Sequence, residues 1–186
     1  AFEKRSAVIE LQPDMCSLTL SSLNFVENAS VNGPDMIWKL AEKMSRFGVK
    51  PELECFGLGM INMGKYLIEK GIVEIPAYWN LLFGNIAGFQ GTLSHMGTAS
   101  SDIPDSHYVS FAGIGSTQTP VTSTAVAMGY GVRVGLEDNI WYDTSRNRKA
   151  TNMELLRRIH RFIDMHDKKV MEPEILGNNG FYNGER

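Results

Sequence analysis

The sequence predicts an α/β fold in which parallel strands line a barrel. Short apolar segments alternate with helical ones along the whole chain, which is the pattern of repeated βα units. The intervals between these strands suit the units of a βα barrel. Each strand also has one apolar face and one face of small or polar groups. Strands of an open parallel sheet are usually apolar on both faces, so a polar second face indicates a barrel interior that holds a site.

The elements follow from periodicity and from stop signals such as Gly and Pro. Strands are expected at residues 15–20, 52–56, 78–84, 107–113 and 131–138. Helices are expected at residues 3–11, 35–48, 57–71, 117–129 and 152–169, with a short helix around residues 91–98. The tail, residues 177–186, is expected to be irregular or to contact a partner. No repeat or linker interrupts the pattern, so residues 1–186 are expected to form one domain.

Composition excludes several classes of protein. The net charge of −3 gives no general attraction to nucleic acid or to an anionic membrane. No apolar run approaches the roughly 20 residues that span a bilayer, and no signal peptide is visible. Cys16 and Cys55 match no zinc-binding spacing, and we interpret them as reduced cysteines of a cytoplasmic protein. The chain begins without Met and inside a helix-like pattern, as expected of a fragment or a processed chain.

The segment Gly131–Asn139, GVRVGLEDN, carries an unusual amount of charge for a strand. Alternation would place its aliphatic residues on one face and Arg133 with Glu137 on the other, with Asp138 at the carboxyl end. Charged side chains facing inward are costly unless they serve a site. Because barrel active sites lie at the carboxyl ends of the strands, we favour a functional role for Glu137 and Asp138.

The predicted inward charges do not balance. Glu52, Glu54 and Glu137 face Arg133 as the single inward cation, and a divalent metal ion would compensate the excess negative charge. For Glu52 alone, we favour a simple pair with Arg133 low in the barrel and no metal.

Two further groups have open interpretations. The turn at Gly113–Thr117 follows a late strand, where Gly113 and Gly115 would let backbone amides approach an anionic substrate group, or merely form a turn. A basic cluster in the last third of the chain could bind phosphates, although we favour a solvated helix face. It comprises Arg146, Arg148, Lys149, Arg157, Arg158 and Arg161.

Several blocks of the sequence, in order, resemble the β-keto acid cleavage enzymes, whose type member is the 3-keto-5-aminohexanoate cleavage enzyme. These are residues 13–25 (PDMCSLTLSSLNF), 50–60 (KPELECFGLGM), 80–85 (NLLFGN), 111–116 (FAGIGS) and 131–139 (GVRVGLEDN). The resemblance implies a zinc-dependent TIM barrel. It also implies a reaction in which a β-keto acid and acetyl-CoA, as co-substrate, yield acetoacetate and a new acyl-CoA.

The resemblance implies roles for residues of this chain. Glu137 would be the carboxylate ligand of Zn²⁺, and Asp138 would be the base that acts with Arg133. Glu54 would be a further catalytic group. Ser17 would contact the substrate carboxylate, and Thr19, where many members have Asn, is a candidate substrate contact. This chemistry is sensible, because a carboxylate can remove a proton α to a carbonyl and a guanidinium can hold a carboxylate.

The chain also departs from the family pattern. The first three βα units, with a His-x-His pair of zinc ligands, are absent, so the chain corresponds to the C-terminal five βα units of the (β/α)8 barrel. Ser116 stands where most members have Arg, and Gly57 replaces a common Asp. We expect the open sheet edges to be covered by a missing N-terminal segment, another chain or a second copy in a homo-oligomer. The alternatives are another metal-dependent keto-acid lyase or aldolase that does not use CoA, and a degenerate, non-catalytic half-barrel subunit.

Overall fold

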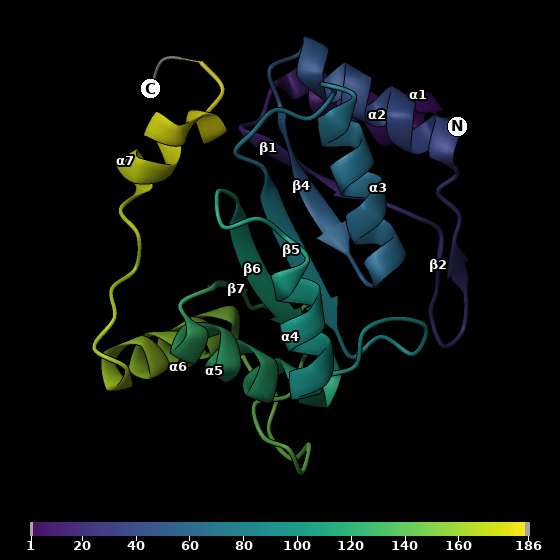
Figure 1. The fold of residues 1–186 in the computed structure, drawn as a ribbon. Helices are drawn as coiled ribbons and strands as arrows, with labels where there is room; N and C mark the ends of the chain where they lie inside the picture. Colours follow the sequence, from purple (N-terminus) through teal and green to yellow (C-terminus); the bar gives the residue numbers. More distant parts are fainter. Residues whose placement is uncertain (1, 185–186) are drawn as a thin grey trace.

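The computed structural model describes residues 2–184 and has a five-stranded parallel sheet at its centre (Figure 1). The strand order β1-β4-β5-β6-β7 follows the order of the chain, so each connection moves one strand along in the same direction. The strands are β1 (Met15–Thr19), β4 (Lys50–Cys55), β5 (Tyr78–Phe83), β6 (Tyr108–Gly113) and β7 (Gly131–Arg133). The expected α/β fold with parallel strands is confirmed.

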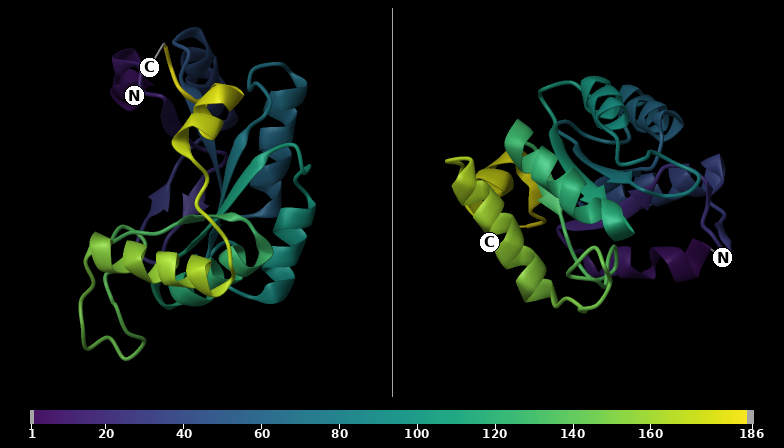
Figure 2. Two further views of the ribbon diagram at one scale, coloured as in Figure 1. Left: turned by 90° about the vertical axis from the view of Figure 1, so that its left-hand side faces the viewer. Right: turned by 90° about the horizontal axis from the view of Figure 1, so that it is seen from below.

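Helices alternate with these strands. They are α1 (Phe2–Ser6), α2 (Pro34–Arg46), α3 (Leu58–Glu69), α4 (Leu93–Ser101), α5 (Gln118–Met128), α6 (Asn152–Met165) and α7 (Pro173–Leu176). Of these, α2, α3 and α5 pack directly on the sheet. Helix α2 contacts β1 and β4, α3 contacts β4, and α5 contacts β6 and β7. Figure 1 shows α3 and α4 in front of the sheet, and the view from below in Figure 2 shows the helices around its outer side. None of the helices in residues 2–184 is long and apolar enough to cross a membrane.

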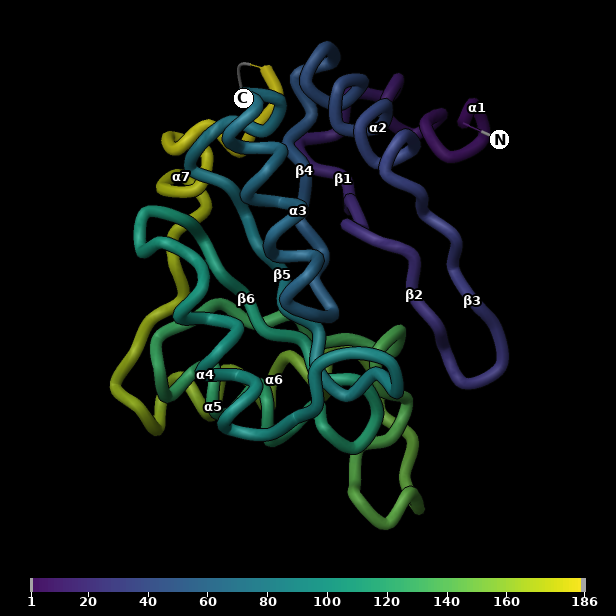
Figure 3. The backbone as a smooth tube through the Cα atoms, turned by 45° about the vertical axis from the view of Figure 1, so that its right-hand side comes forward, coloured from purple at the N-terminus to yellow at the C-terminus, as the bar shows by residue number. Residues whose placement is uncertain are grey.

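Small elements complete the described chain. They are the 3-10 turns η1 (Ala7–Leu11) and η2 (Gly115–Thr117), the hairpin strands β2 (Leu23–Asn24) and β3 (Ala29–Ser30), and the segment η3 (Gly177–Phe181). The hairpin, which the sequence did not predict, extends away from the sheet (Figure 3). The helix expected at residues 3–11 becomes 3-10 from Ala7 onward, and the last long helix ends at Met165 rather than at residue 169.

Strand β7 is shorter than predicted. It ends at Arg133, and residues 135–138 form a turn instead of continuing the strand to residue 138. Hydrogen bonds from the backbone N–H groups of Asp138 and Asn139 to the carbonyl of Gly135 close this turn. Strand alternation therefore does not determine where Glu137 and Asp138 point, and that part of the prediction is wrong.

The alternation of the other strands is confirmed where it matters most. In β4, Leu53 and Cys55 are fully buried among the helices, while Glu52 and Glu54 lie on the opposite face. Parallel pairing then places the polar residues of successive strands beside one another. We call the resulting set the inner polar face; it consists of Ser17, Thr19, Glu52, Glu54, Asn80, Ser110 and Arg133.

The C-terminal segment is more ordered than the sequence predicted. Phe181 is buried and makes edge-to-face contacts with Tyr78 and Tyr108, at the amino ends of β5 and β6. The backbone N–H of Asn183 donates to Asp14, just before β1, at 2.8 Å. The tail thus joins the two ends of the described chain across the amino ends of the strands. Residues 1, 185 and 186, which the predicted domain and tail include, lie outside the described residues.

The two edge strands, β1 and β7, pair with no further strand within residues 2–184. Beside β7 lies an open cavity of about 630 Å³, lined mainly by β6, β7, α6 and the segment that follows α6. Its lining includes Val109, Val132 and Ile159. The edge of the sheet at β7 is therefore accompanied by an apolar space between the strand and its covering helix.

Candidate active site

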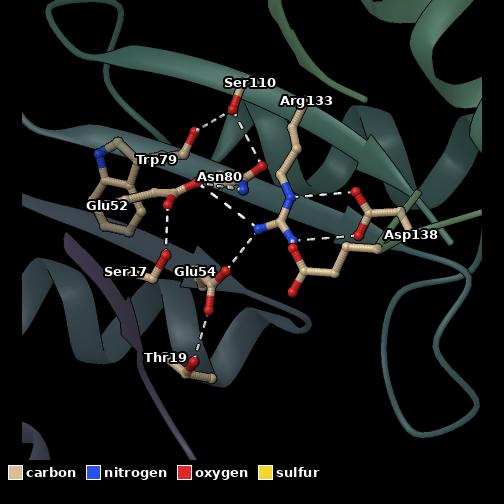
Figure 4. A network of polar contacts seen from close by, with 10 residues as sticks. Ser17, Thr19, Glu52, Glu54, Trp79, Asn80, Ser110, Arg133 and Asp138 are labelled. Carbon is tan, nitrogen blue, oxygen red and sulfur yellow. Dashed lines mark hydrogen bonds and ion pairs between the residues drawn. The ribbon is translucent and has the colours of Figure 1, made fainter. Parts of the chain in front are cut away.

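Arg133, the last residue of β7, lies at the centre of a group of carboxylates (Figure 4). Its Nη1 donates to Glu54 at 2.8 Å and its Nη2 to Glu137 at 3.0 Å. Nε and Nη2 face the two oxygens of Asp138 at 3.3 and 3.4 Å, which is a bidentate contact. The Nη1–Glu52 distance is 4.0 Å, at the limit of an ion pair. One guanidinium thus joins four carboxylates from two segments of the chain, strand β4 and the turn after β7.

These carboxylates differ greatly in burial. The side chains of Asp138 and Glu54 are 7% and 13% exposed, whereas that of Glu137 is 84% exposed. An ion pair with a well-solvated partner contributes little, so the Arg133–Glu137 contact adds little stability. The contacts of Arg133 with Glu54 and Asp138 are the ones that depend on the fold.

Burial raises the pKa of the Asp138 carboxyl group above its ordinary value; Arg133 opposes this rise, while Glu137 and Glu54 add to it. Burial alone would lower the pKa of Arg133, but Asp138, Glu54 and Glu137 together raise it above its usual range, so Arg133 stays cationic. A carboxylate with a raised pKa accepts a proton more readily than an exposed one.

The position of Asp138 is fixed by contacts between two loops. The backbone N–H of Gly115, after β6, donates to the Asp138 carbonyl at 2.7 Å. The side-chain amide of Gln118, at the start of α5, donates to the Gly135 carbonyl at 3.1 Å. Asp138 therefore reaches Arg133 because the loops after β6 and β7 are joined.

A second set of hydrogen bonds orients Glu52. Its carboxylate accepts from Ser17 at 2.7 Å and from the amide of Asn80 at 2.6 Å. Ser110 in turn donates to Asn80 at 3.2 Å. These bonds, rather than the expected pair with Arg133, account for most of the polar contacts of Glu52.

Asn80 and Ser110 belong to the candidate site, although sequence reasoning did not select them. Both are fully buried, and they lie opposite each other in the β5–β6 register. The sequence signal was a single Asn inside the apolar strand YWNLLF, but the register that pairs it with Ser110 is not visible in one sequence.

Ser17 and Thr19 each use their single hydroxyl hydrogen on a glutamate. Ser17 donates to Glu52 and Thr19 to Glu54, both at 2.7 Å. In this arrangement, both hydroxyls present only lone pairs to a ligand. The predicted contact of Ser17 with a substrate carboxylate therefore requires its hydroxyl hydrogen to turn away from Glu52.

The two glycines of the predicted anion loop have different structural roles. A Cβ on Gly113 would lie 2.5 Å from the Gln118 Cα, so the absence of a side chain lets α5 begin against the strand. Gly115 has a φ of +58° and open space around it. Its N–H donates to the backbone carbonyl of Asp138. An anion could therefore accept from this amide only if that hydrogen bond were broken.

The residues present do not suffice for a zinc site. Structural and catalytic zinc sites use at least three protein ligands, and residues 2–184 contain no group of three His, Cys, Asp or Glu side chains arranged to hold a metal ion. Glu137, the predicted ligand, is exposed and contacts Arg133. The described part of the chain thus offers no complete set of zinc ligands at this position.

The fold and the site together define an α/β protein with an arginine–carboxylate cluster at the carboxyl ends of its parallel strands. A family model described as beta-keto acid cleavage enzyme matches residues 1–176. The chain belongs to this family, and the predicted resemblance is confirmed.

Relatives with curated names support the same assignment. A 3-dehydrocarnitine:acetyl-CoA trimethylamine transferase from Rhizobium meliloti is 30% identical over 176 residues, covering 94% of this chain and 58% of the relative. A 3-keto-5-aminohexanoate cleavage enzyme from Acetoanaerobium sticklandii is 32% identical over 180 residues, covering 94% of this chain and 66% of the relative. The chain therefore spans about three-fifths of the length of these relatives.

Solved structures share the fold. The apo structure of ObcA matches 90% of this chain and 44% of its own, with a TM-score of 0.72 and 16% identity. A ternary complex of ObcA with a C4-CoA adduct and oxalate matches 88% of this chain, with a TM-score of 0.70 and 18% identity. At this identity, the likeness concerns the fold alone.

Proposed function

We propose that this chain carries the acid–base half of an enzyme that transfers carbon units between a β-keto acid and acetyl-CoA. The observation that carries the proposal is the bidentate contact of Arg133 with the buried Asp138 at the carboxyl end of β7. The names of relatives, which include acetyl-CoA transferases and β-keto acid cleavage enzymes, point to the same reaction class.

Asp138 would take the proton from the carbon α to the keto group of the β-keto acid. The carbon–hydrogen bond breaks, its electron pair enters the enolate, and the proton moves to a carboxylate oxygen. Arg133 would keep Asp138 ionised before the transfer and hold it in position. Glu54, held by Arg133 and Thr19, would be the second acidic group beside the reacting atoms.

We propose that the sheet is five-eighths of a TIM barrel whose other strands come from outside these residues. The two open edges, the apolar cavity beside β7 and the partial coverage of longer relatives support this. The complementary part would also supply the remaining ligands of a Zn²⁺ ion at Glu137. Because the described residues provide one ligand only, no step above depends on the metal.

The test combines these 186 residues with the N-terminal part of a relative, which the match to this chain does not cover. We would purify the 186-residue chain with and without the N-terminal βα units of the Acetoanaerobium sticklandii relative, added as a separate polypeptide. Acetoacetate would be measured with a panel of β-keto acids, acetyl-CoA and Zn²⁺. We expect acetoacetate from the combination, and its absence in every combination would contradict the proposal.

The same assay separates the two alternative functions. Cleavage of a β-keto acid that does not need acetyl-CoA would indicate another lyase or aldolase. A stable complex that forms without any turnover would indicate a non-catalytic subunit, the alternative that the single metal-ligand carboxylate favours.

A further inference from the structure

The loop between β7 and α6, together with the first turns of α6, concentrates positive charge beside the candidate site. Residues 143–161 contain six Lys and Arg but two Asp and Glu, although the whole chain carries a net charge of −3. The loop projects beyond the carboxyl end of the sheet (Figures 1 and 2) and is closed by a bridge between Trp141 and Lys149. A cationic surface on an acidic protein is a local feature that indicates an anionic ligand.

Two of these arginines pack on the ring of Tyr142. The guanidinium groups of Arg148 and Arg158 lie 4.3 and 3.8 Å from its ring centroid, which is a stacked cation–π arrangement. Arg158 is fixed further by donating to the Tyr142 carbonyl at 2.5 Å and to Thr119 at 2.9 Å. The pKa of the Tyr142 hydroxyl is lowered, first by its hydrogen bond with Arg158 and then by the charges of Arg158, Arg161 and Arg148, which indicates a positive local potential.

Four of these cations keep their charge available. Arg148 pairs with Glu154, and Arg158 is engaged within the stack. By contrast, four are exposed and form no ion pair within residues 2–184, namely Arg146, Lys149, Arg157 and Arg161. The surface therefore combines a fixed aromatic–guanidinium stack with uncompensated guanidinium groups, of which Arg146 shares a cleft with Tyr142 and Arg161 contributes to the positive potential at Tyr142.

A small cleft lies between this surface and the loop that follows β6. Its lining runs from Asn139, the neighbour of Asp138, past Ser116 of the loop after β6 to Tyr142 and Arg146. A ligand with a reactive end at Asp138 and an anionic end at Tyr142 would pass over the loops that line this cleft. Acetyl-CoA has this form, because a flexible arm separates its thioester from its phosphate groups.

We propose that Arg146 and Arg161, together with the Tyr142–Arg148–Arg158 stack, bind the phosphate groups at the nucleotide end of CoA. This inference rests on the proposed function for the identity of the ligand. It replaces the sequence-based preference for a solvated helix face, because the stack and the cleft join these arginines to the loops that position Asp138.

The experiment is calorimetric titration of the 186-residue chain with CoA, dephospho-CoA and inorganic pyrophosphate. The variants are Arg146→Ala, Arg161→Ala and their combination, each checked for an unchanged circular dichroism spectrum and thermal unfolding. Arg157→Ala is the matched control, because Arg157 is an exposed arginine of α6 that does not affect the pKa of Tyr142. We expect each test variant to weaken CoA binding about fivefold and the control less than about twofold.

Salt and ligand comparisons sharpen the result. Raising the salt from about 0.1 M to 1 M shortens the Debye length from about 10 Å to 3 Å and is expected to weaken CoA binding at least as much as either variant. Dephospho-CoA is expected to bind more weakly than CoA, because it lacks one phosphate, and pyrophosphate is expected to compete with CoA.

The proposal is overturned if the wild-type chain does not bind CoA, if the double variant binds it equally well, or if Arg157→Ala has the same effect as Arg161→Ala. Its failure differs from failure of the proposed function. Arginine-dependent CoA binding without acetoacetate formation in the complemented protein would contradict only the function. Turnover with an unchanged KM for acetyl-CoA in the double variant would contradict only this inference.

Discussion

Replacing Arg133 with Met would remove the cation from a group of carboxylates while keeping much of the side-chain volume. The buried contacts are those with Glu54 and Asp138, and a hydrogen bond to a charged group contributes about 1.5 kcal/mol or more. The exposed contact with Glu137 adds almost nothing. We therefore expect Arg133→Met to lower the free energy of unfolding by about 3 kcal/mol at pH 7.

The assay is urea unfolding followed by circular dichroism. With a denaturant slope of about 2.5 kcal/mol/M, a loss of 3 kcal/mol lowers the urea midpoint by about 1 M. Arg157→Met is the control, since it removes an exposed arginine with the same change in charge, and we expect it to shift the midpoint by less than about 0.2 M.

The pH dependence gives the sign of the effect. Without Arg133, the folded-state pKa of Asp138, which burial already raises, rises further, because the cation that opposes burial and the nearby carboxylates is gone. A carboxyl group with a raised folded-state pKa stabilises the fold at low pH, and this stability is lost as the pH rises through that pKa. The deficit of the variant should therefore shrink below about pH 5. A deficit that equals the control, or that grows on acidification, would refute this reasoning.

Three further predictions concern the inner polar face and its loops. Asn80→Ala should cost about 1–3 kcal/mol of unfolding free energy, because it leaves Glu52 without a buried donor; equal stability in urea unfolding would contradict this role. Gly113→Ala should destabilise the chain far more than Gly115→Ala, because a Cβ on Gly113 meets the backbone of α5. A Cβ on Gly115 faces open space, and its positive φ costs about 1–2 kcal/mol. Thermal unfolding of both variants measures the difference, and a reversed order would be inconsistent with the loop geometry. The 186-residue chain alone should bind Zn²⁺ weakly, and Glu137→Gln should change that binding little, because one exposed carboxylate is an insufficient ligand set; tight stoichiometric binding by calorimetry would disprove this.

Strand periodicity predicted the parallel α/β fold and the site residues that lie on the strands themselves. The alternation in β4 correctly separated Leu53 and Cys55 from Glu52 and Glu54, because a regular strand has a period of two. The same rule failed after Arg133, where the chain turns. Asp138 returns to Arg133 through hydrogen bonds between loops, and no local sequence pattern specifies such bonds.

The remaining site residues depend on register. Asn80 and Ser110 are ordinary polar residues in apolar strands, and they become part of the site because parallel pairing places them beside Glu52 and Glu54. The basic cluster was visible in the sequence, but its relation to the cleft required the stacking of Arg148 and Arg158 on Tyr142. One sequence identifies such candidates and leaves their neighbours undetermined.

The central claim is that Asp138 is the base for a proton α to the keto group. The most direct measurement is deuterium incorporation at that carbon of a β-keto acid, followed by NMR in D2O with the complemented protein and without acetyl-CoA. We predict exchange well above the spontaneous rate in the wild type and a loss of at least about 100-fold in the enzyme-dependent rate with Asp138→Asn. Undiminished exchange in the Asp138→Asn protein would contradict the account.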